Sequence, residues 1–273
     1  MPSRRKDLTG KAIERRIAAG FGQGEGASYK PWLRISDVPS KGTCTIITGW
    51  RHGREHHLLS RNERNYFYCL EWQDDVEEVR EQFPLLPLQR TLEIAASLGF
   101  KHPSDRGKPI VMTTDFFLKV RERDGSFCYL ARTVKPSIEL KKPRVQEKFE
   151  IERQYFSEKK IEWGVITPEQ IPDAMWRNID WLHECRDVRK LLPILQKQVD
   201  EVRQWLFHAI NRGQAFRLQD LATSSDHALG CNRGTSLKII RHLIANKQIH
   251  VDITDRLRTD IPLTLSMEHH THA

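Results

Sequence analysis

Residues 111–135 have the sequence VMTTDFFLKVRERDGSFCYLARTVK. Two runs rich in β-branched and aromatic side chains lie on either side of Asp124-Gly125, a dipeptide typical of tight turns. The pattern predicts an antiparallel hairpin with one strand near 110–120 and the other at 127–134.

The length of the turn decides which side chains share a face of this hairpin. A two-residue turn would place Asp115 and Lys135 on opposite faces of the sheet. A three-residue loop at 123–125, with Gly125 left-handed, pairs Asp115 with Thr133 and places Lys135 diagonally on the same face. We predict this second register, or a bulge with the same effect.

Asp115 interrupts a run that is otherwise suited to a buried strand. Aspartate is unfavourable in strand interiors, and burial of its charge without a partner is costly. A metal ion would compensate the charge. Hydrogen bonds to a neighbouring loop would also do so, and the residues alone do not decide between these alternatives.

Glu63 is the second carboxylate at a position that should face inward. It falls at helical spacing from apolar residues, namely Leu59, Tyr66, Phe67 and Leu70. The alternative is a capping box, in which Glu63 reaches back to the amide of Ser60.

Glu152 lies within an apolar helical stripe formed by Val145, Phe149 and Phe156, whereas Glu147 and Glu150 are expected to face solvent. An inward carboxylate at this position could anchor Lys135 or a metal-bound water. A buried structural ion pair is equally compatible with the pattern.

Buried carboxylates and a lysine are the residues expected in an active site that hydrolyses phosphodiesters with the help of magnesium. Magnesium prefers hard oxygen ligands and retains waters, so its protein site needs only a few Asp or Glu groups. Three histidines, His52, His56 and His57, lack the zincin pattern, and we expect them to contact DNA or to pack. No spacing supports catalysis by a nucleophilic side chain.

Further elements surround the hairpin, with strands near 44–49, 76–83 and 161–166 and helices near 60–72, 89–98 and 145–159. The alternation predicts an α/β domain at 1–166, built on a mixed sheet flanked by helices. After Thr167-Pro168 the pattern becomes helical, so 167–273 is predicted to be a second domain.

The second domain is expected to contain helices near 218–222 and 235–246, followed by strand-like runs at 249–253 and 261–265. This order suits a helix-turn-helix with a β wing, and it suits a protein-interaction module equally well. Possible phosphate contacts on its solvent faces are the basic residues Lys238, Arg241, Lys247, Arg256 and Arg258.

The composition is that of a folded, basic protein. Of the 273 residues, 38% are hydrophobic and 29% charged, and the net charge is +8. DNA is a natural partner, although a merely basic soluble protein has the same balance. Five widely spaced cysteines without a C-x-x-C pair, and no apolar run of 18 residues, favour a cytoplasmic protein.

Taken together, these segments resemble the TnsA family of transposon-end endonucleases. The resemblance covers most of residues 13–166 and depends on several motifs in the same order. They include Pro31-Trp32-Leu33, His56-His57-Leu58-Leu59-Ser60, Arg80-Glu81-Gln82-Phe83-Pro84, Thr114-Asp115-Phe116 and Val134-Lys135-Pro136.

The resemblance implies a restriction-endonuclease-like fold with Glu63, Asp115 and Lys135 as the catalytic set. It also implies Mg²⁺, for which Mn²⁺ substitutes, held by Glu63, Asp115, Thr133 and Val134. The family usually has Gln two residues before the lysine, where this chain has Thr133. Glu152 falls in a segment similar to the family helix that follows the lysine strand.

For function, the resemblance implies cleavage at the 5′ ends of a transposon, with a TnsB-like transposase and a TnsC-like ATP-dependent regulator as partners. The family's carboxy-terminal domain is winged-helix-like. Two other interpretations stay open at this point: a standalone nuclease of the same fold, and a noncatalytic DNA-binding assembly subunit.

Overall fold

The computed structural model describes residues 10–38, 43–191, 193–210 and 215–267. The chain divides into two compact units, Met1–Ile171 and Pro172–Ala273. The sequence predicts this division after residue 166, five residues earlier. Each unit is described by itself.

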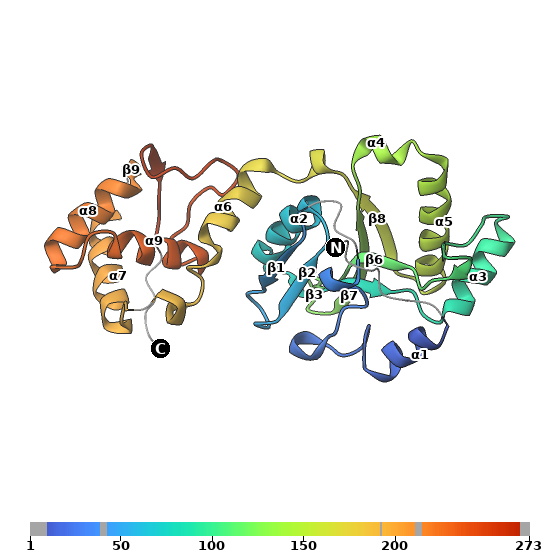
Figure 1. Ribbon diagram of the computed structural model, residues 1–273. Coiled ribbons are helices and arrows are strands. Elements are labelled where there is room, and N and C mark those ends of the chain that lie inside the picture. The colour runs from blue at the N-terminus through green and yellow to red at the C-terminus, as the bar shows by residue number, and fades with distance from the viewer. Residues whose placement is uncertain (1–9, 39–42, 192, 211–214, 268–273) are drawn as a thin grey trace. The chain divides into compact units, whose positions relative to one another are not determined.

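The centre of the first unit is a four-stranded sheet in the order β3-β6-β7-β8. Its strands are β3 (Val76–Pro84), β6 (Thr113–Arg121), β7 (Phe127–Val134) and β8 (Glu162–Ile166). The first three pair antiparallel, and β8 runs parallel to β7. The sheet is therefore mixed and is flanked by helices, as the sequence predicts (Figure 1).

Helices cover both faces of this sheet. On one face, Phe117 of β6 and Ala131 of β7 pack with Phe156 of α5 (Pro143–Glu158) and Ile94 of α3 (Leu88–Ser97). Successive strand residues point to opposite faces. Phe116 accordingly meets the other face, where its ring lies 5.5 Å from that of Tyr66 on α2 (Arg61–Trp72).

Local sequence explains where these helices begin. Ser60 caps α2 by accepting a hydrogen bond from the amide of Glu63, and Pro143 occupies the first turn of α5, where its missing N–H costs nothing. Figure 1 shows α2 on one side of the sheet and α3 and α5 on the other.

Smaller elements complete the first unit. These are α1 (Lys11–Ala18), the hairpin of β1 (Thr45–Thr48) and β2 (Glu55–Leu58), the pair β4 (Ser104–Asp105) and β5 (Lys108–Pro109), and α4 (Ser137–Leu140). The sequence predicts β1 but not β2. Three of the four residues of β2 are polar, two histidines and a glutamate, so the segment lacks the alternation of polar and apolar residues that predicts a strand.

The second unit is mainly helical. Its elements are α6 (Asp173–His183), α7 (Gln196–Ile210), β9 (Ala215–Arg217), α8 (Leu218–Leu229), α9 (Thr235–Ala245) and β10 (Pro262–Thr264). Of the two strand-like runs predicted here, 261–265 contains β10, whereas 249–253 forms no strand. β10 pairs with β9, and the 249–253 segment contributes the single bridge His250↔Ser266.

Candidate active site

The carboxylate of Glu63 turns inward at the first turn of α2. Its Oε2 accepts a hydrogen bond from the amide of Leu59 at 2.8 Å, and only 6% of the residue is exposed. Half of the capping box is present, because Ser60 Oγ accepts from the Glu63 amide. The carboxylate itself binds the amide one residue before Ser60, which leaves it able to contact the sheet.

Gln82 connects Glu63 to Asp115. Its Nε2 lies 3.2 Å from Glu63 Oε2 and 3.4 Å from Asp115 Oδ1. One carboxylate comes from α2 and the other from β6, so this amide joins two segments about fifty residues apart in sequence. The structure therefore brings the two predicted carboxylates together.

The predicted hairpin register is confirmed along β6 and β7. Gly125 is left-handed with φ 86°, and the amide of Glu122 donates to the carbonyl of Ser126 at 2.8 Å. The loop therefore has three residues. The strand ladder ends at Phe116↔Arg132, one pair before Asp115.

Beyond the ladder, the backbone of β7 binds the side chain of Asp115 directly. Asp115 Oδ2 accepts from the amide of Val134 at 2.7 Å. Lys135 follows β7, and its own amide donates to the carbonyl of Ile166. Burial raises the pKa of Asp115, and the positive charge of Lys135 opposes that shift.

Glu152 reaches the site through Thr133. The hydroxyl of Thr133 donates to Glu152 Oε1 at 2.6 Å, and Thr114 Oγ1 lies 3.2 Å from the same hydroxyl. Glu152 thus binds a threonine, where the sequence suggested an anchor for Lys135. The hydroxyl of Thr133 is therefore engaged in this side-chain network.

Burial raises the pKa of all three carboxyls. For Glu63, burial acts first and the charge of Asp115 second. For Asp115, burial outweighs the hydrogen bond from Val134, the charge of Lys135 and the amide of Gln82. Burial raises the pKa of Glu152 to about 7. Burial therefore disfavours the charged form of each of these carboxyls in the absence of a cation.

Such a site fits a hard divalent cation. Within the described ranges, no cluster of three or more His, Cys, Asp and Glu side chains suits a metal. Two carboxylates are nevertheless enough for magnesium, which keeps several waters and also accepts backbone carbonyls. The donor set of Glu63 and Asp115 is therefore compatible with this ion and unsuited to zinc.

Gln82 was not singled out from the sequence as a site residue. It follows Arg80 and Glu81 in β3, and all three are buried. A strand with consecutive buried polar residues breaks the alternation of polar and apolar positions. That run of polar residues before Phe83-Pro84 was the available signal.

His56 packs in the interior whereas His52 is exposed, and among the described residues no group of three or more histidines and acids could hold a metal ion. His56 is 5% exposed, its Nδ1 lies 2.9 Å from Glu81 Oε2, and its ring lies 4.5 Å from that of Phe67. Arg54 forms an ion pair with the same carboxylate at 2.7 Å. This buried group attaches the β1–β2 hairpin to β3, next to Gln82.

Basic residues of the second unit differ in their surroundings. Lys238, Arg256 and Arg258 are exposed, although Arg258 forms an ion pair with Asp260 at 2.7 Å. Lys247 is half-buried. Arg256 Nη1 lies 3.3 Å from Asn178 Oδ1.

The structure corrects the prediction that Arg241 lies on a solvent face as a phosphate contact. The arginine does not lie there, because it donates to the carbonyl of Trp181 and its guanidinium stacks 4.8 Å from that ring. The Nδ1 atom of the neighbouring His242 lies 2.8 Å from the carbonyl oxygen of Cys185. The end of α6 and the residues after it thus cover this side of α9.

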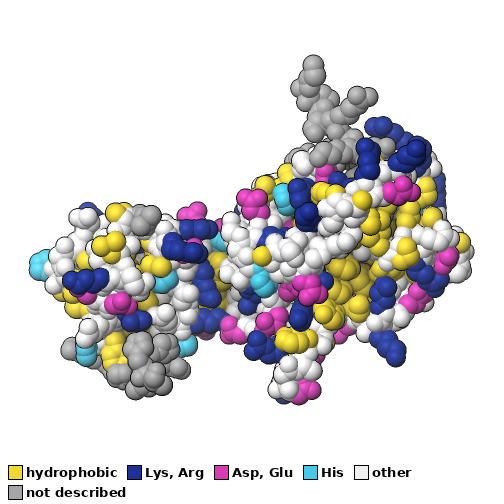
Figure 2. Space-filling model, turned by 90° about the horizontal axis from the view of Figure 1, so that it is seen from below, with side chains coloured by type: hydrophobic (Ala, Val, Ile, Leu, Met, Phe, Trp, Pro, Cys, Tyr) yellow, Lys and Arg dark blue, Asp and Glu magenta, His cyan; other side chains and the backbone are white. Residues whose placement is uncertain are grey.

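Charge is interspersed on the surface as the sequence suggests. On the face drawn in Figure 2, Lys and Arg side chains lie among Asp and Glu side chains.

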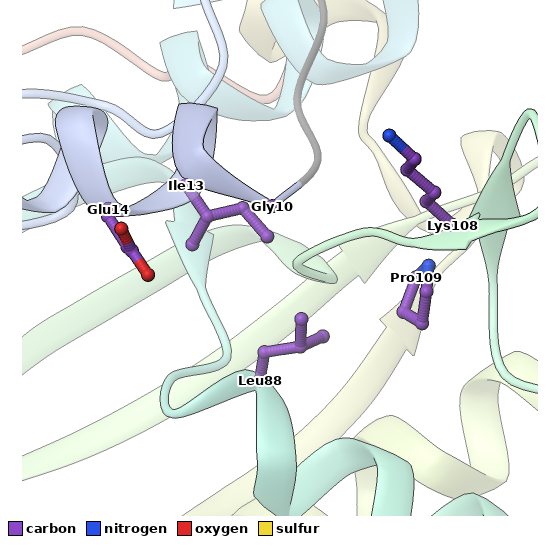
Figure 3. Close-up of a pocket in the computed structure, with 6 residues that line it drawn as sticks. All are labelled: Gly10, Ile13, Glu14, Leu88, Lys108 and Pro109. Atoms are coloured by element: carbon purple, nitrogen blue, oxygen red, sulfur yellow. The ribbon is translucent and has the colours of Figure 1, made fainter.

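A separate pocket lies between α1, the start of α3 and β5 (Figure 3). Its lining includes Ile13, Leu88 and Pro109 and none of the predicted catalytic side chains. A search of the described residues finds no helix that could span a membrane.

Comparisons with known proteins show the family of this chain. The family model described as "TnsA-like endonuclease N terminal" matches residues 73–168, and "TnsA endonuclease C terminal" matches 170–253. The transposon Tn7 transposition protein TnsA of Escherichia coli is 37% identical over 248 residues, covering 91% of this chain and 88% of the relative. The chain belongs to the TnsA endonuclease family.

Proposed function

We propose that this chain cuts DNA at the 5′ ends of a transposon, as the endonuclease subunit of a heteromeric transposase. Membership in the TnsA endonuclease family supports a role in transposition. The observation that carries the proposal is the meeting of two carboxylates, buried Glu63 and half-buried Asp115, at the one side-chain amide of Gln82.

Glu63 and Asp115 would hold Mg²⁺, with backbone carbonyls at Thr133 and Val134 as further ligands, and Mn²⁺ would substitute. A divalent cation bound there supplies a Lewis acid for the scissile phosphate and lowers the pKa of a coordinated water. Burial of the two carboxylates supports this assignment, because it disfavours their charge until a cation compensates it.

Other groups of the chain would position the attacking water and the metal ligands. The ammonium group of Lys135 orients the attacking water and stabilises the negative charge that develops on the phosphate. The amide of Val134 fixes the rotamer of Asp115. Glu152 holds the end of β7 through Thr133. Hydrolysis leaves a 3′ hydroxyl and a 5′ phosphate.

We assign the catalytic role to a restriction-endonuclease-like domain at 1–166 and DNA or partner binding to a winged-helix-like domain at 167–273. The order β9-α8-α9-β10, with β9 paired to β10, supports the second assignment. Exposed Lys238, Arg256 and Arg258 are the proposed phosphate contacts, and Lys247 is a weaker one because it is half-buried. The proposed partners are a TnsB-like transposase and a TnsC-like regulator, in the bacterial cytoplasm.

A reconstituted cleavage assay tests the proposal. Duplex DNA that carries a transposon end is incubated with the full chain and Mg²⁺, with and without the TnsB-like partner. We expect cuts at the 5′ strand only when the partner is present. Cutting by the chain alone would favour a standalone nuclease, and Mn²⁺ binding unchanged in Asp115→Ala would favour a noncatalytic subunit.

A further inference from the structure

We infer that Gln82 is a positioning residue of the metal site, whose carboxamide holds Glu63 and Asp115 together before a cation binds. The inference rests on the proposed function, because it concerns the same two carboxylates. It adds a residue that acts through the two carboxylates, which its side-chain nitrogen contacts.

The backbone at Gln82 departs from the strand that contains it. Its neighbours pair normally, Glu81 with Phe116 and Phe83 with Thr114. Gln82 itself has φ 49°, in the left-handed region that residues other than Gly rarely adopt. Its carbonyl accepts a hydrogen bond from the amide of Trp32 at 3.1 Å, which fixes this conformation from outside the sheet.

The orientation of the carboxamide follows from its partners. Thr113 Oγ1 donates to Gln82 Oε1 at 3.3 Å, so the nitrogen points at the carboxylates. The reverse orientation would place the amide oxygen against Glu63 Oε2 and Asp115 Oδ1. Gln82 is 2% exposed, so water does not compete for these contacts.

The choice of side chain fits a role at the carboxylates better than a role in the backbone. Gly or Asn adopts a left-handed conformation more easily than Gln does. The side chain of Asn, however, is one methylene shorter, so its amide would lie farther from the two carboxylates that the amide of Gln82 contacts. A Lys or Arg would reach both acids but would neutralise them and compete with a cation. A neutral amide donates to both carboxylates and leaves their charge for the metal.

The test separates the side chain from the backbone. Gln82→Gly removes the amide and relieves the unfavourable φ, whereas Gln82→Leu removes the amide and keeps the bulk. Mn²⁺ alone is titrated into the full chain by calorimetry, and melting temperature is measured in EDTA. We expect both variants to bind Mn²⁺ about 10- to 100-fold more weakly, as loss of such supporting contacts usually causes. Gln82→Gly should melt at or above the wild-type temperature.

Two controls complete the design. Lys160, which also has positive φ, is exposed in the turn before β8. Lys160→Gly should bind Mn²⁺ as the wild type does, and a loss of affinity there would overturn the inference. Wild-type affinity in both Gln82 variants would also overturn it. Asp115→Asn distinguishes failure of the proposed metal site from failure of the inferred role of Gln82. If that variant keeps full Mn²⁺ affinity, the proposed metal site itself is wrong.

Discussion

Replacement of Glu152 with Gln should make the stability of the first unit less sensitive to pH. Burial raises the pKa of Glu152 from an ordinary value near 4.5 to about 7. Without divalent ions, the folded protein therefore keeps this proton after the unfolded chain has lost it. The stabilisation is complete below pH 4.5 and is lost as the pH rises through 7.

The size of the effect follows from the two pKa values. The difference between about 7 and 4.5 corresponds to about 3 kcal/mol, because one pKa unit is worth about 1.4 kcal/mol. Gln keeps an oxygen for the hydroxyl of Thr133 and carries no charge. At pH 8 the free energy of unfolding of Glu152→Gln should therefore exceed that of the wild type by up to about 3 kcal/mol. At pH 4.5 the two should be nearly equal.

Native-state hydrogen exchange in EDTA measures this difference. Peptides from 127–134 and 143–158, followed at increasing urea and corrected for intrinsic rates at each pH, report this unit separately from the other. Glu63 and Asp115 also titrate in this range, and their contribution is common to both proteins except for the charge of Asp115, which is the smallest of the influences on the pKa of Glu152. Glu150→Gln is the matched control on α5, because Glu150 forms an ion pair with Arg153 and its pKa is lowered.

The control should show no change in relative stability between pH 5 and 8. The reasoning is refuted if Glu152→Gln and wild type differ by the same amount at pH 4.5 and 8. It is also refuted if the variant loses stability relative to wild type as the pH rises.

Three further changes have definite outcomes. Lys135→Ala should slow 5′ cleavage by about 100-fold or more in single-turnover assays and leave DNA binding in gel shifts unchanged, because its charge acts on the transition state. Gly22→Ala should cost roughly 1–3 kcal/mol in urea unfolding, since the added carbon would lie 2.2 Å from Pro84 Cγ at φ 74°. Glu81→Gln should cost about 3–5 kcal/mol in the same measurement, because it leaves Arg54 buried beside an uncharged amide; equal stability would contradict the buried ion pair.

The hairpin and its register were predictable because local rules fix them. Gly125 supplies the left-handed residue that a three-residue loop requires, and strand alternation then carries the register to the last ladder pair, Phe116 with Arg132. Asp115 and Glu63 stood out because each places a charge on an apolar face. Their meeting in one site was a prediction from the family resemblance, and the geometry agrees with it.

The contacts of Gln82 and Glu152 were not predictable from spacing. Gln82 meets Glu63 because its backbone turns out of the strand, and no sequence pattern signals a left-handed glutamine. Glu152 binds Thr133 because Thr133 lies on the same face of β7 as Ala131, and α5 packs on that face. Helical spacing placed Arg241 on a solvent face because it shows one helix alone, whereas α6 covers that face.

The run at 261–265 contains β10, but its partner strand β9 was missed for a related reason. β9 has three residues, and its partner β10 lies about 45 residues later in the chain. Alternation over three residues is too short to distinguish a strand from a loop. The pairing depends on the packing of α8 and α9, which separate the two strands in the sequence.

Cleavage of a transposon-end duplex, measured across Mg²⁺ concentrations with the TnsB-like partner present, tests the shared metal site most directly. Wild-type chain should cut the 5′ strand in proportion to bound Mg²⁺ and should not cut in EDTA, while Asp115→Asn should leave the strand intact at every concentration. Wild-type cutting in EDTA, or cutting by Asp115→Asn at the wild-type rate, would contradict the assignment of Glu63, Asp115 and Lys135 to one catalytic centre.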